Sequence, residues 1–333
     1  MLPIVDYLLG SWDVGRVRPI AVENAESVHT MENGAHQASN MTWERNAATE
    51  IPKAVTWIAV LMLSTLVVIL YARVLVSLAR QWGNDPNYSH GLFVPLFAAY
   101  VLWIERERWG AIPSRTNNFG FAIMLFAAAL LVLGTLAAEL FTTRLSLLIM
   151  IAGVILSLAG SKVLRSIAFP IGYLIFMIPL PAIVYYQLTF PLQLLASRLG
   201  ASGLVALGIH TVREGNLLIL PNCTLNVVEA CSGIRSLLSL MAAVVAYGYL
   251  TEPGTWRRMA LAVASIPIAI ATNGLRLVAT GVLSFYFGPA VDSGVVHLGL
   301  GVGFFALAFC SVLAIHKLLR LHSSYQNPGR AYP

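Results

Sequence analysis

Long apolar runs dominate this chain. From residue 54 onward they recur at roughly the length of a membrane-spanning helix, and short polar stretches separate them. An α-helix of about 20 apolar residues crosses a hydrocarbon layer of roughly 30 Å. The pattern therefore predicts spanning helices over residues 55–79, 88–104, 119–138, 145–160, 166–187, 232–250, 259–284 and 294–316.

The stretch 190–207 is apolar but differs from these runs. It follows Pro179 and Pro181, contains Pro191 and carries Arg198. It could be a ninth span, a re-entrant hairpin or a helix that lies in the membrane interface.

The distribution of Lys and Arg favours eight spans. Cytoplasmic loops hold the excess of these residues. If residues 190–207 do not cross, most Lys and Arg fall in cytoplasmic segments, and the outer segments keep Arg80, Arg144, Arg198 and Arg213. If they do cross, Arg257 and the C-terminal tail move outside. We therefore expect about eight transmembrane helices, one additional interfacial or re-entrant segment, and both termini in the cytoplasm.

Composition agrees with an all-α integral membrane protein. Hydrophobic residues make up 58% of the 333 residues and charged residues 11%, against roughly 45–50% and 25% in soluble domains. We predict an N-terminal extension over residues 1–53, disordered or upstream of the true start. A polytopic domain over 54–320 and a cytoplasmic tail over 321–333 follow.

The net charge of +6 does not indicate a nucleic-acid partner, because Lys and Arg are scattered singly rather than gathered into one stripe. The three cysteines are too few, and odd in number, for a disulfide framework. The sequence leaves the oligomeric state open.

Arg276 is the most costly residue of the predicted spans, because a charge near the bilayer centre costs roughly 2.5–3.5 kcal/mol. Asn273 lies three residues earlier, on the same helix face. Arg276 could snorkel to the interface or pair with Glu229. Alternatively, it is a fixed cation in a cavity at the outer leaflet.

Cys231 stands where an outer loop meets the sixth span, followed by Ser232, Gly233 and Arg235. A helix N-terminus and a cation four residues on both favour the thiolate, which is the nucleophilic form. The alternatives are a small buried hydrophobic residue or a disulfide with Cys223.

Two histidines are candidates for proton transfer. His297 opens the last span, on the same predicted side as Cys231 and Arg276, and His90 lies in the first outer loop. Either could instead be an interfacial residue. Together, Cys231, Arg276 and His297 form a set for acyl transfer: thiolate attack, oxyanion stabilisation and protonation of the leaving amine.

Other chemistries lack their motifs. The chain has no metalloprotease, phosphate-loop or serine-hydrolase signature. The spans do not supply the clustered ligands of a metal site. We therefore predict neither a metal nor a cofactor.

Several stretches carry a family resemblance. Residues 229–236 (EACSGIRS), 273–276 (NGLR) and 297–301 (HLGLG) resemble the exosortase/archaeosortase family, and so do 88–91 (YSHG) and 176–181 (FMIPLP). The resemblance covers about residues 55–316. It implies a polytopic cysteine transpeptidase of the bacterial inner membrane, with the active site facing the periplasm.

The resemblance implies that Cys231 is the nucleophile, Arg276 the transition-state arginine and His297 the proton-transfer residue. Its implied substrates are exported proteins whose C-terminal tail combines a Pro-Glu-Pro-type motif, one hydrophobic helix and a basic end (PEP-CTERM). The acidic motif would suit Arg213 or Arg235. The supporting or substrate-binding residues are then Glu229, Ser232, Gly233, Arg235, Asn273, His90 and Arg213.

Two other functions stay open on the sequence. A transporter or flippase for an anionic lipid or glycan would use the same arginines and would tolerate Cys231→Ala. A non-catalytic assembly protein would also tolerate Arg276→Ala and His297→Ala. The acyl acceptor of the transpeptidase is not identified by the sequence.

Overall fold

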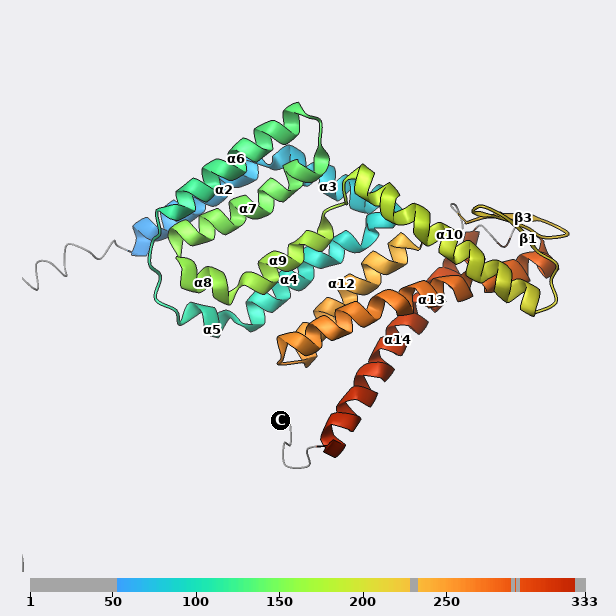
Figure 1. The fold of residues 1–333 in the computed structure, drawn as a ribbon. Helices are drawn as coiled ribbons and strands as arrows, with labels where there is room; N and C mark the ends of the chain where they lie inside the picture. The colour runs from blue at the N-terminus through green and yellow to red at the C-terminus, as the bar shows by residue number, and fades with distance from the viewer. Residues whose placement is uncertain (1–52, 228–232, 289–290, 292–293, 327–333) are drawn as a thin grey trace, which may run out of the picture. The chain divides into compact units, whose positions relative to one another are not determined.

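The computed structural model describes residues 53–227, 233–288, 291 and 294–326. The chain divides into two compact units, residues 1–62 and 63–333, and the first contributes only the start of helix α2 to the described part. The elements are α2 (Lys53–Leu70), α3 (Ala72–Asn84), η1 (Pro86–Leu92), α4 (Phe93–Ile104), α5 (Arg106–Gly110), α6 (Phe119–Leu136), α7 (Leu140–Leu158), α8 (Ser161–Ser166), α9 (Ala168–Tyr173), η2 (Leu174–Met177), α10 (Ala182–Ala206), β1 (Val212–Glu214), β2 (Leu217–Ile219), β3 (Thr224–Asn226), α12 (Ile234–Thr251), α13 (Thr255–Phe287) and α14 (Gly294–Gln326) (Figure 1).

Within the described residues, five helices are long and apolar enough to cross a membrane. They are α6, α7, α12, α13 and α14, and each overlaps a predicted span. Two bent helix pairs pass the same test only when each pair is taken together, so the candidate spans number five to seven. The architecture is that of an all-α membrane protein with one small sheet, and the count of about eight spans stays a prediction.

Two predicted spans are interrupted. The run 55–79 is divided between α2, which ends at Leu70, and α3, which begins at Ala72. The run 88–104 is divided between the 3₁₀ helix η1 and α4. The 12 residues of α4 extend about 18 Å at 1.5 Å per residue, which is shorter than the hydrocarbon layer. The predicted runs overlook these breaks although α3 and η1 are more polar than α2 and α4.

The boundary predicted between 166–187 and 190–207 is wrong. Residues 190–206 belong to α10, which begins at Ala182, and the break lies at residues 178–181. Helices on the two sides of this break meet at 74°. Pro179 and Pro181 explain its position, since proline lacks the N–H that helix continuation requires. Pro191 is accommodated inside α10.

A three-stranded antiparallel sheet, absent from the predicted elements, precedes the predicted cysteine motif. Its order is β1-β2-β3, with Leu218 opposite Leu225. Both side chains are buried, in a cluster that also contains Leu204 and Leu277. The sheet thereby packs onto α10 and α13.

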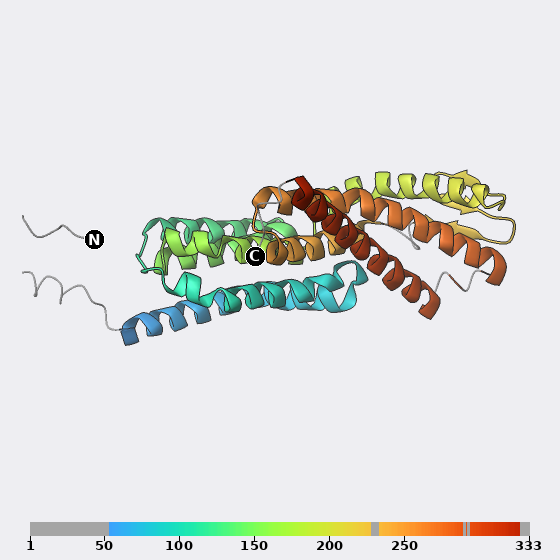
Figure 2. The same ribbon diagram turned by 90° about the horizontal axis from the view of Figure 1, so that it is seen from below.

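Helix α13 lies against α10, α12 and α14 (Figure 1, Figure 2). Glycines allow the close approach to α10: a Cβ at Gly200 would lie 2.7 Å from Leu277, and one at Gly203 would lie 2.4 Å from Val278. Small residues at helix contacts are typical of membrane proteins, where van der Waals packing drives association. This packing positions the middle of α13, which carries Arg276.

An ionic cluster joins α12 and α14 at the far end of α12. Glu252 is buried and bonds to His316 Nε2 at 2.6 Å and Arg320 Nε at 2.7 Å. Tyr247 Oη lies 2.7 Å from Nδ1 of the same histidine. Arg257 adds a contact at 3.6 Å. The polar groups at this end are thus paired with one another.

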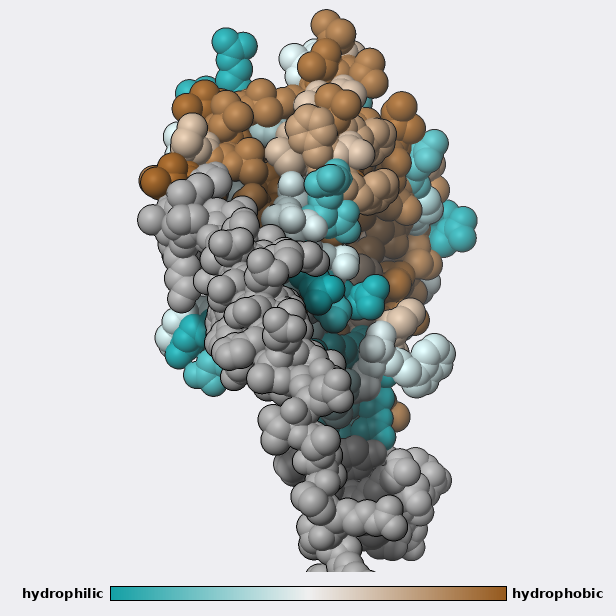
Figure 3. All heavy atoms as spheres, turned by 90° about the vertical axis from the view of Figure 1, so that its left-hand side faces the viewer, coloured by the Kyte–Doolittle hydropathy of each residue, from teal (hydrophilic) through white to brown (hydrophobic). Residues whose placement is uncertain are grey.

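Large apolar side chains are exposed along the helices, among them Phe119, Phe121 and Leu125 of α6 and Leu298 and Val302 of α14. Figure 3 shows mostly hydrophobic residues on the coloured part of its face, with hydrophilic residues gathered in a few places. Exposed apolar patches of this extent are typical of surfaces that contact lipid or another protein.

Candidate active site

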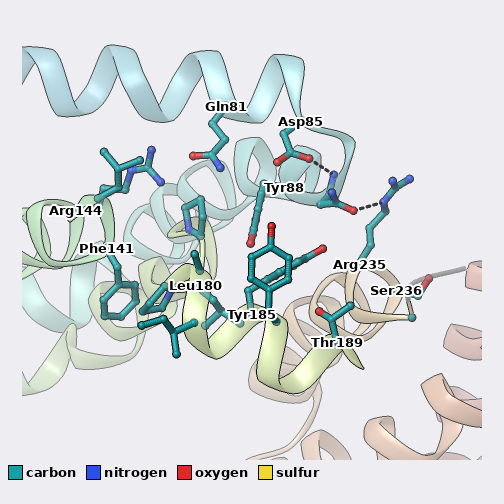
Figure 4. A pocket seen from close by; sticks show the side chains of 18 of the residues that line it. Gln81, Asp85, Tyr88, Phe141, Arg144, Leu180, Tyr185, Thr189, Arg235 and Ser236 are labelled. Atoms are coloured by element: carbon teal, nitrogen blue, oxygen red, sulfur yellow. Dashed lines mark hydrogen bonds between the residues drawn. The ribbon is translucent and has the colours of Figure 1, made fainter. Parts of the chain in front are cut away.

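A cavity of about 850 Å³ opens where several helices end. Its wall is built by the end of α3, η1, the turn between α6 and α7, residues 179–193, the start of α12, and one side chain each of α13 and α14 (Figure 4). Ligand pockets generally hold roughly 300–1,000 Å³. The cavity is therefore large enough for a short peptide segment.

Arg276 and His297 meet in this wall. Arg276 Nη2 lies 3.0 Å from His297 Nε2, and the arginine is 9% exposed. A guanidinium only donates hydrogen bonds, so Nε2 accepts, and the imidazole carries no proton on that nitrogen. Gly301 lies beside the guanidinium, where a Cβ would make an ordinary van der Waals contact with Nη2 at 3.6 Å. Two of the three predicted catalytic residues are thus in direct contact.

The start of α12 lies beside the same helix face. Gly233 lines the cavity, and a Cβ on it would lie 3.0 Å from Asn273 Nδ2. Its φ of +71° is in the left-handed region that favours glycine. Asn273 is buried and stands three residues before Arg276. The structure therefore places Gly233 and Asn273 side by side, next to Arg276.

Arg235 belongs to the same wall and is tied to η1. Its Nε donates to Asn87 Oδ1 at 3.2 Å, and Asp85 Oδ1 accepts from the Asn87 backbone N–H at 2.9 Å (Figure 4). The predicted residues Cys231, Glu229 and Ser232 lie outside the described residues.

Comparison with known protein families matches residues 82–314 to the model of the transmembrane exosortases. The match covers more than half of the chain and includes the start of α12, Arg276 and His297. The chain belongs to the transmembrane exosortase family. No curated protein and no solved structure matches it. Membership gives this exosortase a general role as a membrane transpeptidase.

The two histidines of this exosortase occupy different places. His297 lines the cavity against Arg276. His90 Nδ1 lies 3.2 Å from Ser239 Oγ of α12, and His90 is not among the residues that line the cavity. Geometry therefore favours His297 for chemistry, and it gives His90 a contact between η1 and α12.

Arg213 is not brought to the cavity. It lies on the exposed strand β1, and its Nη1 donates to the Gly215 carbonyl at 2.9 Å. The same nitrogen lies 3.5 Å from Ser197 Oγ. The Arg213 side chain therefore contacts α10 and the turn between β1 and β2. A direct contact with a ligand in the cavity is thus not supported by its placement.

Arg144 lines the cavity and was not among the predicted site residues. The predicted span 145–160 left it in an outer loop, but α7 begins at Leu140, so Arg144 lies within the helix and is 2% exposed. The signal was an arginine directly before an apolar run, preceded by Glu139, since acidic residues are enriched near helix N-termini.

Glu139 begins α7 and also lines the cavity. Its carboxylate accepts from the backbone N–H groups of Phe141 at 3.0 Å and Thr142 at 2.5 Å. Burial raises the pKa of this carboxyl, but the hydrogen bonds from Thr142 and Phe141 and the charge of Arg144 outweigh it and hold the pKa below its ordinary value. Glu139 therefore stays ionised near neutral pH.

Proposed function

We propose that this exosortase is a membrane cysteine endopeptidase and transpeptidase that cleaves C-terminal sorting tails from exported proteins. The observation that carries the proposal is the contact between Arg276 Nη2 and His297 Nε2, 3.0 Å apart in the wall of the cavity. Gly233 lines the same cavity, and Cys231 precedes it by two residues.

In the proposed reaction, the carbonyl oxygen of the substrate competes with His297 for the N–H groups of Arg276. Release of Nε2 from Arg276 frees this nitrogen to take the proton of the Cys231 thiol, and the resulting thiolate attacks the carbonyl carbon. Arg276 stabilises the oxyanion that forms, and the protonated Nε2 gives its proton to the leaving amine. The C–N bond breaks, and the acyl group remains on sulfur as a thioester. An amine acceptor or water then attacks the thioester and regenerates the thiol.

The site would face the periplasm of a bacterial inner membrane, with both termini in the cytoplasm. Segments assigned to the outer side by their few basic residues, such as the α6–α7 turn and the loop that holds Asp85, line the cavity. Segments assigned to the cytoplasm meet elsewhere, since Glu105 bonds to Tyr249 at 2.7 Å and Glu252 to Arg320. This separation supports one reactive face.

The substrate would be a protein that ends in an acidic Pro-Glu-Pro-type motif, a hydrophobic helix and a basic tail. The helix would lie in the lipid beside the exosortase, and the segment before it would enter the cavity. The acyl acceptor is an amine of unspecified identity or water.

The test is co-expression of the full chain with a secreted reporter that ends in such a tail. We expect wild type to shorten the reporter and Cys231→Ala to leave it intact, because Cys231 supplies the nucleophile in the proposed reaction. Cys310→Ala is the matched control, since Cys310 is an exposed cysteine of α14. Equal processing by wild type and Cys231→Ala would contradict the proposal and favour a transporter or flippase.

A further inference from the structure

Arg144 has no role in the chemistry proposed above, although it lines the same cavity. Figure 4 shows it at one end, with Arg235 and Ser236 at the other. Arg276, Ser236 and Asn273 share a second small hollow, so Arg276 belongs to the Ser236 end. Arg144 is therefore a buried cation at the end of the cavity away from the reactive groups.

The guanidinium of Arg144 makes no direct ion pair with a carboxylate of the described residues. Its Nη2 donates to Ser77 Oγ at 3.2 Å. In the described part of the chain, no carboxylate lies within 4.0 Å of it. Arginine carries five N–H donors, arranged for a bidentate contact with a carboxylate. A cation buried without such a partner is costly, which makes an anionic ligand favourable here.

The two carboxylates that line the cavity are engaged elsewhere. Glu139 accepts from two backbone N–H groups at the start of α7, and Asp85 accepts from the Asn87 backbone. Both caps are local contacts that form with the helices themselves. Neither carboxylate contacts Arg144 directly in the described residues, and Glu139 acts on it only through its charge at longer range.

The rest of the wall suits an extended peptide. Tyr88, Tyr185 and Gln81 present hydroxyl and amide groups near the middle of the cavity, and Pro179 and Leu180 present apolar surface (Figure 4). Such a wall can bind a peptide backbone but does not select a charge. At the Arg144 end of the cavity, a preference for a negatively charged substrate side chain then depends on Arg144.

We propose that Arg144 determines substrate specificity by binding the side-chain carboxylate of an acidic residue in the substrate, at a distance from the peptide bond that is cleaved. This inference rests on the proposed peptidase function. A carboxylate held by Arg144 fixes the register of the peptide, so one particular bond lies beside Arg276 and His297. Arg235, already bonded to Asn87, is not required for this contact.

The experiment is a double-mutant cycle with the full chain in cells. Wild type and Arg144→Gln are each co-expressed with two tailed reporters, one with Pro-Glu-Pro before the hydrophobic helix and one with Pro-Gln-Pro. We expect Arg144→Gln to slow processing of the glutamate reporter by roughly 10- to 100-fold, the value of a charged hydrogen bond. The glutamine reporter should be processed at the same low rate by both enzymes.

Matched variants separate recognition from folding. Arg80→Gln removes an exposed arginine of α3 and should change neither reporter. Equal slowing of both reporters by Arg144→Gln, or no slowing of the glutamate reporter, would overturn the assignment. If Arg144→Gln does not accumulate in the membrane, Arg144→Lys takes its place. Lysine keeps the charge but loses the bidentate contact, so the glutamate preference should shrink while the rate on glutamine stays the same, and an unchanged preference would overturn the assignment.

The two proposals fail in different ways. If wild type cuts neither reporter, or Cys231→Ala cuts both, the peptidase function itself is wrong. If wild type cuts both reporters equally well and Cys231→Ala cuts neither, the peptidase function stands and the role of Arg144 is wrong.

Discussion

Glu252→Gln tests the ionic cluster that joins α12 to α14. The Glu252 side chain is 1% exposed and contacts His316, Arg320 and Arg257. The substitution keeps the size of the side chain and one accepting oxygen, and it removes the charge. The two arginines then lose their counter-ion and His316 loses a charged hydrogen-bond partner, so we expect the folded state to be destabilised.

The magnitude follows from the exposure of the partners. Removing one member of a fully buried ion pair costs roughly 3–5 kcal/mol. Here Arg257 and Arg320 are 40% and 51% exposed and can be solvated after the substitution. The amide can also still accept one hydrogen bond. We therefore expect a loss of about 2–3 kcal/mol in the free energy of unfolding.

The Glu252 carboxylate should also make the folding stability depend on pH. Burial raises the pKa of Glu252, but the hydrogen bonds and charges of His316 and Arg320 outweigh it and hold the pKa below its ordinary value of 4.5. A depressed folded-state pKa contributes stability above the unfolded value, and this contribution is lost as the pH falls through the folded value. Glu252→Gln should therefore lack the acid-dependent loss of folding stability that the Glu252 carboxylate causes in wild type.

The assay is thermal unfolding of the detergent-solubilised chain at pH 7 and below pH 4.5. Glu214→Gln is the control, because Glu214 is an exposed carboxylate on β1, and it should change the free energy of unfolding by less than about 0.5 kcal/mol. If Glu252→Gln unfolds at the same temperature as wild type at pH 7, the assigned energy of the cluster is wrong. An unchanged acid-dependent loss would contradict the pKa argument.

Three further predictions concern the site and its scaffold. Arg276→Ala should slow reporter processing by roughly 10²- to 10³-fold, as expected for loss of an oxyanion donor, and Arg276→Lys should restore only part of this in the same gel assay. His297→Ala should abolish processing, whereas His90→Ala should lower it only modestly; the reverse ranking would make His90 the proton carrier. Gly120→Ala should lower the unfolding midpoint, because its Cβ would lie 2.4 Å from the Ser157 backbone nitrogen, at a cost of about 1–3 kcal/mol. Gly83→Ala meets no atom within 4 Å and is its control.

Much of the helical architecture could be predicted from local patterns. The helices α6, α7, α12, α13 and α14 overlap predicted spans because transfer of about 20 apolar residues into lipid depends on their composition and hardly on their neighbours. The breaks at Tyr71 and at residues 178–181 were missed or misplaced, since the residues next to each break continue an apolar run. The small sheet was missed because its strands have three residues each.

The sequence by itself determined the membrane class, the family and the presence of Arg276 and His297 as costly polar residues, because these depend on composition, motifs and burial in lipid. Only the tertiary structure decided which partners they have. His297 contacts Arg276, His90 contacts Ser239, and Arg144 lines the cavity. Each of these placements brings together residues of separate helices. Such contacts depend on how glycine-lined helices pack, and the 3.6-residue periodicity of a single helix carries no information about its neighbour.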